Sequence, residues 1–251
     1  MERVIKVKLS EIEEKENVKI VHAIESGSRA WGFASPDSDY DVRFIYVRPK
    51  EYYLKLDKAR DVIEWQLDDT LDINGWDLQK ALRLLYKSNP TLFEWSYSPI
   101  IYKTTSYYQE LKKEIDSFFS CKASLYHYLS TAHSNYRKYL KGDYVRLKNY
   151  FYVVRPILAC KWILDKKVSP PVLFSELMEA ELEASMKPII GDLLKVKMEA
   201  PEVGEGKRIG AINTYIESSL AELKGMIDLQ ENDKNSSWDR LNELFLMGIE
   251  L

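Results

Sequence analysis

The residues best suited to chemistry lie between positions 26 and 47, which read SGSRAWGFASPDSDYDVRFIYV. Gly27 and Ser28 directly follow an apolar, β-branched run. Glycine lets the backbone come close to a ligand, and a serine hydroxyl with exposed amide groups can hold a phosphate. A helix that begins after Ser28 would also turn its positive end toward that phosphate. The pair is therefore a candidate phosphate-binding turn.

A pair of acids follows, because Asp39 and Asp41 lead into a second β-branched run. Residues two apart in a strand share a face, so the two carboxylates are expected side by side. Adjacent carboxylates repel each other and are stabilised by a divalent cation, and oxygen ligands favour Mg²⁺ or Mn²⁺. We therefore predict that both aspartates bind metal. Arg43 shares their face in a regular strand, where it either pairs with the carboxylates or contacts a substrate.

A metal site of this kind is completed by a third carboxylate on a neighbouring strand. Asp72 is the first candidate, because Leu71 and Ile73 flank it and can pack inward, which leaves Asp72 on the opposite face. Asp77 is the second candidate, although its position fits a helix N-cap better. Glu64 is the third.

A phosphate-holding turn joined to a carboxylate metal site predicts phosphoryl or nucleotidyl transfer. Reactions at phosphorus depend on positioning and charge neutralisation, which two metal ions can supply. The alternate spacing of Asp37, Asp39 and Asp41 also suggests an EF-hand loop. Such a loop requires glycine at its sixth position and glutamate at its twelfth, where this chain has Val42 and Arg48. The EF-hand is therefore excluded.

The elements that must position these residues change in character near residue 106. The pattern predicts strands over 18–25, 41–47, 61–66 and 71–76, a polar turn over 68–70, and a short helix opened by a capping box at Ser10. Asp77 is expected to cap a helix that ends before Asn89-Pro90. Helical spacing then dominates over 106–119, 122–140, 144–166, 174–198 with a break near 187, 207–228 and 237–248, and 199–206 is the clearest loop.

These elements predict an α/β fold in two parts. Residues 1–105 are expected to form a small mixed sheet with helices packed on one side. Residues 106–251 are expected to form an α-helical bundle domain.

A second region of interest is basic and rich in tyrosine. Residues 134–167 hold nine Lys or Arg against two acids, with five tyrosines interleaved. Lys148, Tyr152 and Arg155 share a helical face at i+4 and i+3 spacing, so they are candidates for binding a nucleotide or RNA through phosphate contacts and base stacking. The alternative is a solvated basic helix with half-buried tyrosine stems. Pro156 is expected to kink this helix or mark its restart.

Composition limits the class of protein. The chain has 251 residues, of which 45% are hydrophobic and 30% charged, as in an ordinary globular protein. A net charge of −3 argues against non-specific coating of nucleic acid. Cys121 and Cys160 lie in apolar helical contexts and are expected in the core rather than in a disulfide. There is no signal-peptide pattern and no apolar run near the ~18 residues of a membrane span, so we expect a cytoplasmic protein without a membrane partner.

Together the motifs resemble a known family. Gly27-Ser28 followed by Asp39-x-Asp41 resembles the DNA polymerase beta-like nucleotidyltransferase superfamily. More narrowly, the segments SGSRAWGF, SDYDVRFIYV, LDINGWDLQKAL and SNPTLFEWSYSP are similar to a branch of bacterial and phage nucleotidyltransferases described as the RNA-repair-pathway polymerase beta family. The resemblance is strong over the first ~100 residues and weaker over 148–162; it implies a polymerase beta palm-like sheet.

The resemblance also implies roles for the motif residues. Gly27 and Ser28 would hold the triphosphate, and Asp39 and Asp41 would bind both metals. Asp72 would bind one metal and help to deprotonate the acceptor hydroxyl. The full set expected to bind nucleotide is Gly27, Ser28, Arg29, Ser38, Lys148, Tyr152 and Arg155, although Arg29 is equally well explained as an exposed turn residue.

The expected reaction transfers a nucleoside monophosphate from an NTP such as ATP to an acceptor hydroxyl, with Mg²⁺ or Mn²⁺ as cofactor. Three alternatives stay open for the acceptor and role. The acceptor is an RNA or DNA end, which the basic, tyrosine-rich region favours, or a small molecule or protein side chain, which the weak acidic charge favours. The third alternative is a non-catalytic nucleotide-binding module, against which the intact carboxylates argue.

Overall fold

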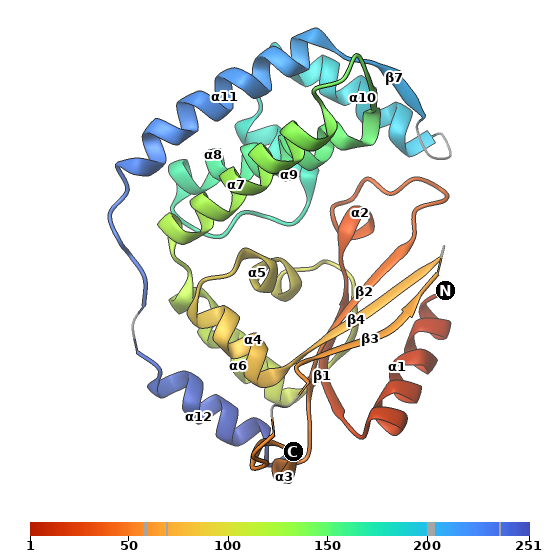
Figure 1. Cartoon of the computed structure of the whole chain (residues 1–251), viewed down its shortest axis with the longest axis vertical. Coiled ribbons are helices and arrows are strands. Elements are labelled where there is room, and N and C mark those ends of the chain that lie inside the picture. The colour runs from red at the N-terminus through yellow and green to blue at the C-terminus, as the bar shows by residue number, and fades with distance from the viewer. Residues whose placement is uncertain (58–59, 69, 200–203, 236) are drawn as a thin grey trace. The chain divides into compact units, whose positions relative to one another are not determined.

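The computed structural model describes residues 1–57, 60–68, 70–199, 204–235 and 237–251. The chain groups into two compact units (Figure 1). The first contains Met1–Ala30, Asp39–Phe118 and Asn235–Leu251, and the second contains Trp31–Ser38 and Phe119–Lys234. This grouping differs from a division after residue 105, because 106–118 and the C-terminal segment join the first unit and 31–38 joins the second. In the described part of the chain, no helix combines the length and apolar character of a membrane span.

The first unit is built on a five-stranded sheet in the order β3-β4-β2-β1-β5. Its strands are β1 (Lys19–Glu25), β2 (Tyr40–Val47), β3 (Val62–Leu67), β4 (Leu71–Asp77) and β5 (Ile101–Thr104). Its helices are α1 (Glu2–Glu16), α2 (Gly27–Ala30), α3 (Lys50–Tyr53), α4 (Leu78–Tyr86), α5 (Pro90–Ser96), α6 (Ser106–Ile115), the 3₁₀ turn η1 (Asp116–Phe118) and α12 (Asp239–Gly248). β2 and β4 run parallel and the other pairs are antiparallel, which confirms a mixed sheet.

Helices cover both faces of this sheet (Figure 1). On one face, Ile5 and Leu9 of α1 pack with Val42 of β2 in a continuous apolar cluster. On the other, His22 of β1 stacks on Tyr108 of α6 at a ring distance of 3.7 Å. The expectation of helices on one side is therefore wrong, because β1 is buried on both of its faces.

Helix α1 also starts earlier than the capping-box pattern predicts. It begins at Glu2, and the Ser10 hydroxyl donates to the Lys6 carbonyl one turn back instead of capping a new helix. Asp77 does cap α4, since its carboxylate accepts from the Gln79 amide at 2.8 Å. That interaction confirms the N-cap and ends β4 at the start of the helix.

The second unit is helical, as expected, apart from one small two-stranded sheet. Its elements are α7 (Cys121–Tyr139), β6 (Tyr144–Arg146), the 3₁₀ turn η2 (Leu147–Tyr150), α8 (Phe151–Lys166), α9 (Phe174–Glu181), α10 (Lys187–Glu199), β7 (Glu205–Lys207) and α11 (Gly210–Asp228). The helix expected over 144–166 therefore begins only at Phe151. The loop expected over 199–206 lies partly outside the described residues, and its end belongs to β7.

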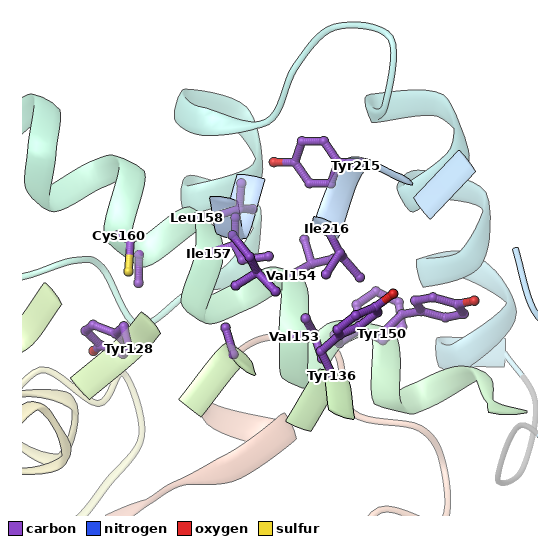
Figure 2. Packing of buried hydrophobic residues seen from close by; sticks show 14 of the residues in the cluster. Tyr128, Tyr136, Tyr150, Val153, Val154, Ile157, Leu158, Cys160, Tyr215 and Ile216 are labelled. Atoms are coloured by element: carbon purple, nitrogen blue, oxygen red, sulfur yellow. The ribbon is translucent and has the colours of Figure 1, made fainter. Parts of the chain in front are cut away.

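Helix α8 is the centre of this second core. Figure 2 shows Val153, Ile157 and Leu158 of α8 among side chains of the neighbouring helices, with Ile216 of α11 alongside. Pro156 lies inside α8 and has no amide to donate to the carbonyl four residues before it. That carbonyl accepts instead from the Asn135 side chain of α7 at 3.0 Å, so the helix continues through the proline.

Candidate active site

The Gly27-Ser28 turn lies against Asp41, one of the two acids of the predicted pair. The Ser26 amide donates to the Asp41 carbonyl at 2.8 Å, which joins the end of β1 to the start of β2. Gly27 then adopts a φ of 60°, a left-handed conformation that glycine tolerates. A Cβ atom at Gly27 would lie 2.0 Å from Asp41 Oδ2. Any other residue at position 27 would therefore collide with the carboxylate.

Asp72 lies beside Asp41. The two residues are register partners on the parallel strands β4 and β2, so their side chains project from the same face. Arg43 joins them, because its Nη2 lies 2.9 Å from Asp41 Oδ1 and 2.6 Å from Asp72 Oδ2. Of the two roles that the sequence leaves open for Arg43, the structure shows the ion pair. The cation that this carboxylate pair holds here is a guanidinium.

Asp39 lies just before β2 and is exposed. Its carbonyl accepts from Arg29 Nε at 3.0 Å, and the Arg29 guanidinium lies over the Tyr40 ring at 3.7 Å. Burial raises the pKa of the Asp41 carboxyl, Arg43 opposes that shift, and repulsion from Asp39 and Asp72 adds to it. Asp39 and Asp72 therefore both repel the charged form of Asp41.

The other candidates for the third carboxylate lie elsewhere on the sheet. Asp77 is at the far end of β4, where it caps α4 and accepts from the Tyr53 hydroxyl at 2.8 Å. Its burial raises the pKa of its carboxyl to about 6. Glu64 is exposed on β3 and pairs in register with Asn74. The geometry thus favours Asp72 as the third acid.

Glu25 is a residue of this site that the sequence analysis missed. Its side chain is 0% exposed, and its Oε1 accepts from the Asp41 amide at 2.8 Å. Its Oε2 accepts from the Tyr102 hydroxyl of β5. Burial raises the pKa of the Glu25 carboxyl. The available signal was an acid at the end of an otherwise apolar strand, directly before the Gly-Ser turn.

The remaining predicted nucleotide-binding residues belong to the second unit. Ser38 closes a turn, and its hydroxyl accepts from the Ser35 amide at 2.9 Å. Arg155 is 4% exposed and lies over the Trp31 ring at 4.5 Å, within the core of that unit. Lys148 precedes α8 rather than lying on it, so the three residues expected on one helical face do not form a single surface. Lys148 and Tyr152 do line a common groove of about 440 Å³.

The donor chemistry of the acidic cluster suits a hard divalent cation. Asp41 and Asp72 offer only carboxylate oxygens and are partly exposed, with side-chain exposures of 22% and 28%. Among the described residues, however, no three acidic, histidine or cysteine side chains are gathered closely enough to hold a metal ion. The carboxylates are thus the kind of ligand that magnesium prefers, but Arg43 lies between Asp41 and Asp72 in this arrangement.

The chain is similar to known proteins in sequence and, weakly, in structure. The chain is 45% identical over 246 residues to the uncharacterized protein YcgL of Bacillus subtilis (strain 168), covering 96% of this chain and 94% of that protein. A crystal structure of a nucleotidyltransferase-like protein from Exiguobacterium sibiricum 255-15 shares 14% identity. It covers 91% of this chain and 74% of that one with a TM-score of 0.33, which is too low to bear on the site.

The family assignment rests on the whole length of the chain. A family model described as the RNA repair pathway DNA polymerase beta family matches residues 1–247. That match includes the glycine-serine turn, the acidic pair and Asp72. The chain belongs to the RNA repair pathway DNA polymerase beta family.

Proposed function

We propose that this protein is a metal-dependent nucleotidyltransferase that transfers a nucleoside monophosphate from an NTP to an acceptor hydroxyl. One observation carries the proposal. The Asp41 carboxylate lies against the Gly27 turn on one side and beside its register partner Asp72 on the other. A turn suited to phosphate and acids suited to magnesium therefore meet at one place, as nucleotidyl transfer requires.

The residues of the first unit have separate roles in binding the nucleotide and the metal ions. The amides and hydroxyl of Gly27-Ser28 bind the triphosphate, and Asp39, Asp41 and Asp72 would hold the Mg²⁺ or Mn²⁺ ions. When bound, these ions neutralise the charge on the triphosphate and polarise the acceptor oxygen. Before they bind, Arg43 supplies the counter-charge to Asp41 and Asp72.

Asp72 accepts the proton of the acceptor hydroxyl. The acceptor oxygen forms a bond to the α-phosphorus, and the bond from that phosphorus to the bridging oxygen breaks. Pyrophosphate leaves with the electron pair. Positioning and charge neutralisation, rather than a covalent enzyme intermediate, lower the barrier to this transfer.

An RNA end is the acceptor that we propose. The description of the family places it in RNA repair. The groove that contains Lys148 and Tyr152 adds a basic, aromatic surface to the same chain. The assay described next distinguishes an RNA end from the other possible acceptors, which are a DNA end, a small molecule and a protein side chain.

The test incubates the full chain with α-labelled NTPs and Mg²⁺ or Mn²⁺, in the presence of RNA ends, DNA ends or small acceptors. We expect label on RNA. Asp41→Asn and Asp39→Asn should reduce transfer by at least about 100-fold while the protein stays folded, since charge stabilisation of the transition state is lost. Asp61→Asn is the matched control, because Asp61 is an exposed acid that pairs with Lys80 on the surface.

The outcomes distinguish the alternatives. Label on a small molecule or protein would overturn the RNA acceptor but keep the enzyme. Nucleotide binding without transfer to any acceptor would overturn the enzyme. Full activity of Asp41→Asn would overturn the metal site.

A further inference from the structure

A second candidate binding site lies wholly within the helical unit. The groove is formed by the C-terminal end of α7, the β6 strand, the η2 turn and the first turn of α8, with β7 on one side. Its volume of about 440 Å³ lies within the range of ligand pockets, roughly 300–1,000 Å³. None of the residues of the acidic cluster lines it. It therefore requires its own explanation.

The groove is positively charged in a chain whose net charge is −3. Among the residues that the structure describes, three cations line it, Lys138, Arg146 and Lys148, together with the carboxylate of Glu205. Lys138 and Arg146 are exposed. A local concentration of cations in a weakly acidic protein indicates an anionic ligand.

Tyrosines line the same groove. Tyr144 is 63% exposed and Tyr139 is 37% exposed, whereas Tyr136 and Tyr150 are core residues at 4% and 0%. The Tyr150 hydroxyl lies 2.8 Å from the side-chain oxygen of Asn213, as expected of a structural tyrosine. The interleaved tyrosines thus separate into core residues and rings presented to the groove. Exposed rings beside cations suit stacked bases between phosphates.

The β6–β7 pair fixes the orientation of the groove residues. Val145 is buried, so its neighbours Tyr144 and Arg146 project to the opposite face of the strand. Arg146 pairs in register with Glu205, and Val145 pairs with Gly206. A Cβ atom at Gly206 would lie 3.2 Å from the Leu147 side chain, so glycine lets the two strands sit close to η2. An aromatic ring and a guanidinium are therefore held side by side.

We propose that this groove binds a single-stranded nucleic acid. Lys138, Arg146 and Lys148 contact successive phosphates, and bases stack on Tyr144 and Tyr139. Because stacking accepts every base, the groove binds without marked sequence preference. The claim that the groove holds the acceptor strand rests on the proposed function. The claim that the groove binds single strands does not depend on that function.

The test measures binding without nucleotide or metal, so it is independent of transfer. The full chain is titrated into fluorescein-labelled 12-nucleotide oligo-U and oligo-dT, and anisotropy is recorded from low to moderate salt. Tyr144→Ala should weaken binding by on the order of tenfold. Lys138→Gln with Lys148→Gln should lower the slope of log affinity against log salt by about 1.4, since each neutralised phosphate of a single strand contributes about 0.7.

Tyr126→Ala is the matched control for the stacking residue. Tyr126 is a tyrosine of the same unit, 44% exposed on α7, with its hydroxyl on Asp228 outside the groove. It should bind as the wild type does. Lys195→Gln is the control for charge, because Lys195 lies on α10 and pairs with Asp192.

Tighter binding of oligo-U than of oligo-dT identifies RNA as the ligand, the reverse identifies DNA, and either supports the proposal. Equal affinity of Tyr144→Ala and Tyr126→Ala overturns it. Displacement of the oligonucleotides by polyglutamate of matched charge also overturns the proposal. Polyglutamate has no bases to stack, so such displacement would show that the site recognises charge alone and that its tyrosines do not contribute to binding. If the groove binds strands but no label is ever transferred, the inference stands and the proposed function fails.

Discussion

Asp41 is held by three neighbours at the scale of single residues. Gly27 leaves room for its carboxylate, and Glu25 accepts a hydrogen bond from its backbone amide. Arg43 forms an ion pair with its Oδ1. Strand alternation places Arg43 on the face of the acid, with the ion pair as one of two roles that the sequence leaves open, whereas the turn motif gives Gly27 a phosphate-binding role and no contact with Asp41. Glu25 could not be predicted in the same way. Its role depends on the pairing of β1 with β2 and β5, which juxtaposes residues distant in the chain.

Arg43 is expected to compete with divalent cations for Asp41 and Asp72. Arg43→Gln removes the guanidinium that bridges the two carboxylates, so their mutual repulsion is no longer offset. The variant should therefore bind Mn²⁺ more tightly than the wild type when no nucleotide is present, as measured by paramagnetic resonance of free Mn²⁺. Arg240→Gln is the control, since Arg240 pairs with Glu114 and Glu243 on the surface. Unchanged or weaker Mn²⁺ binding in Arg43→Gln would contradict this role.

Glu25 is expected to act as a positioning residue. Glu25→Ala leaves the Asp41 amide without its acceptor and lets the carboxylate shift, which should lower kcat by on the order of 100-fold with little change in KM. Glu25→Gln keeps an oxygen for that amide and a polar partner for Tyr102, so it should restore most of the activity. Steady-state kinetics of both variants checks this. Equal loss in the two variants would show that the charge of Glu25, rather than its geometry, is what matters.

At the scale of elements, the long and strongly patterned segments were the predictable ones. Strands β1 to β4 lie within a few residues of their expected ranges, because β-branched runs bounded by turn residues leave little choice. The short strands β5, β6 and β7 were not predicted. A strand of three or four residues carries no periodicity, and it forms only because a partner strand is already present. The residues of β6 were assigned to a helix for that reason.

The contact between β1 and α6 makes stability sensitive to acid. His22 is buried against Tyr108, and burial lowers its pKa from 6.5 to about 4. Between these values the unfolded chain binds a proton that the folded chain does not, so stability falls as the pH drops from about 6.5 to about 4. His22→Phe keeps a ring in the stack and cannot titrate.

Urea unfolding of both proteins across this range measures the effect. The stability of the wild type relative to His22→Phe should fall by roughly 3 kcal/mol toward pH 4, from 1.36 kcal/mol per unit of pKa. Other titrating groups are common to both proteins and cancel in the difference. If the free energy of unfolding changes with pH in the same way for both proteins, His22 is not the group that makes stability sensitive to acid.

At the scale of the whole molecule, the sequence predicted an α/β part and a helical part, and both are present. It did not predict that the units are assembled from separated segments. Hydrophobic periodicity shows that α12 has an apolar face, but it does not show which part of the chain packs against that face. In the structure, Leu244 of α12 is buried, and its carbonyl accepts from the Tyr107 hydroxyl of α6 at 2.8 Å. That partner lies more than a hundred residues away, beyond the reach of local pattern.

The first unit should therefore depend on the C-terminal segment. A chain that ends at Lys234 lacks α12 and loses the burial of Leu241 and Leu244, which costs about 3–6 kcal/mol at 1.5–3 kcal/mol for each side chain. We expect a lower urea midpoint for that chain than for one that ends at Ile249 and keeps α12 intact. If both chains unfold at the same midpoint, α12 does not stabilise the unit to which it is assigned.

The most direct test of the nucleotide site is a crystal structure of the full chain with Mg²⁺ and a non-hydrolysable NTP. We predict that the triphosphate contacts the amides of Gly27 and Ser28, that magnesium is bound by Asp39, Asp41 and Asp72, and that Arg43 no longer lies between Asp41 and Asp72. A nucleotide bound elsewhere, with Arg43 still bridging the two carboxylates, would contradict the account.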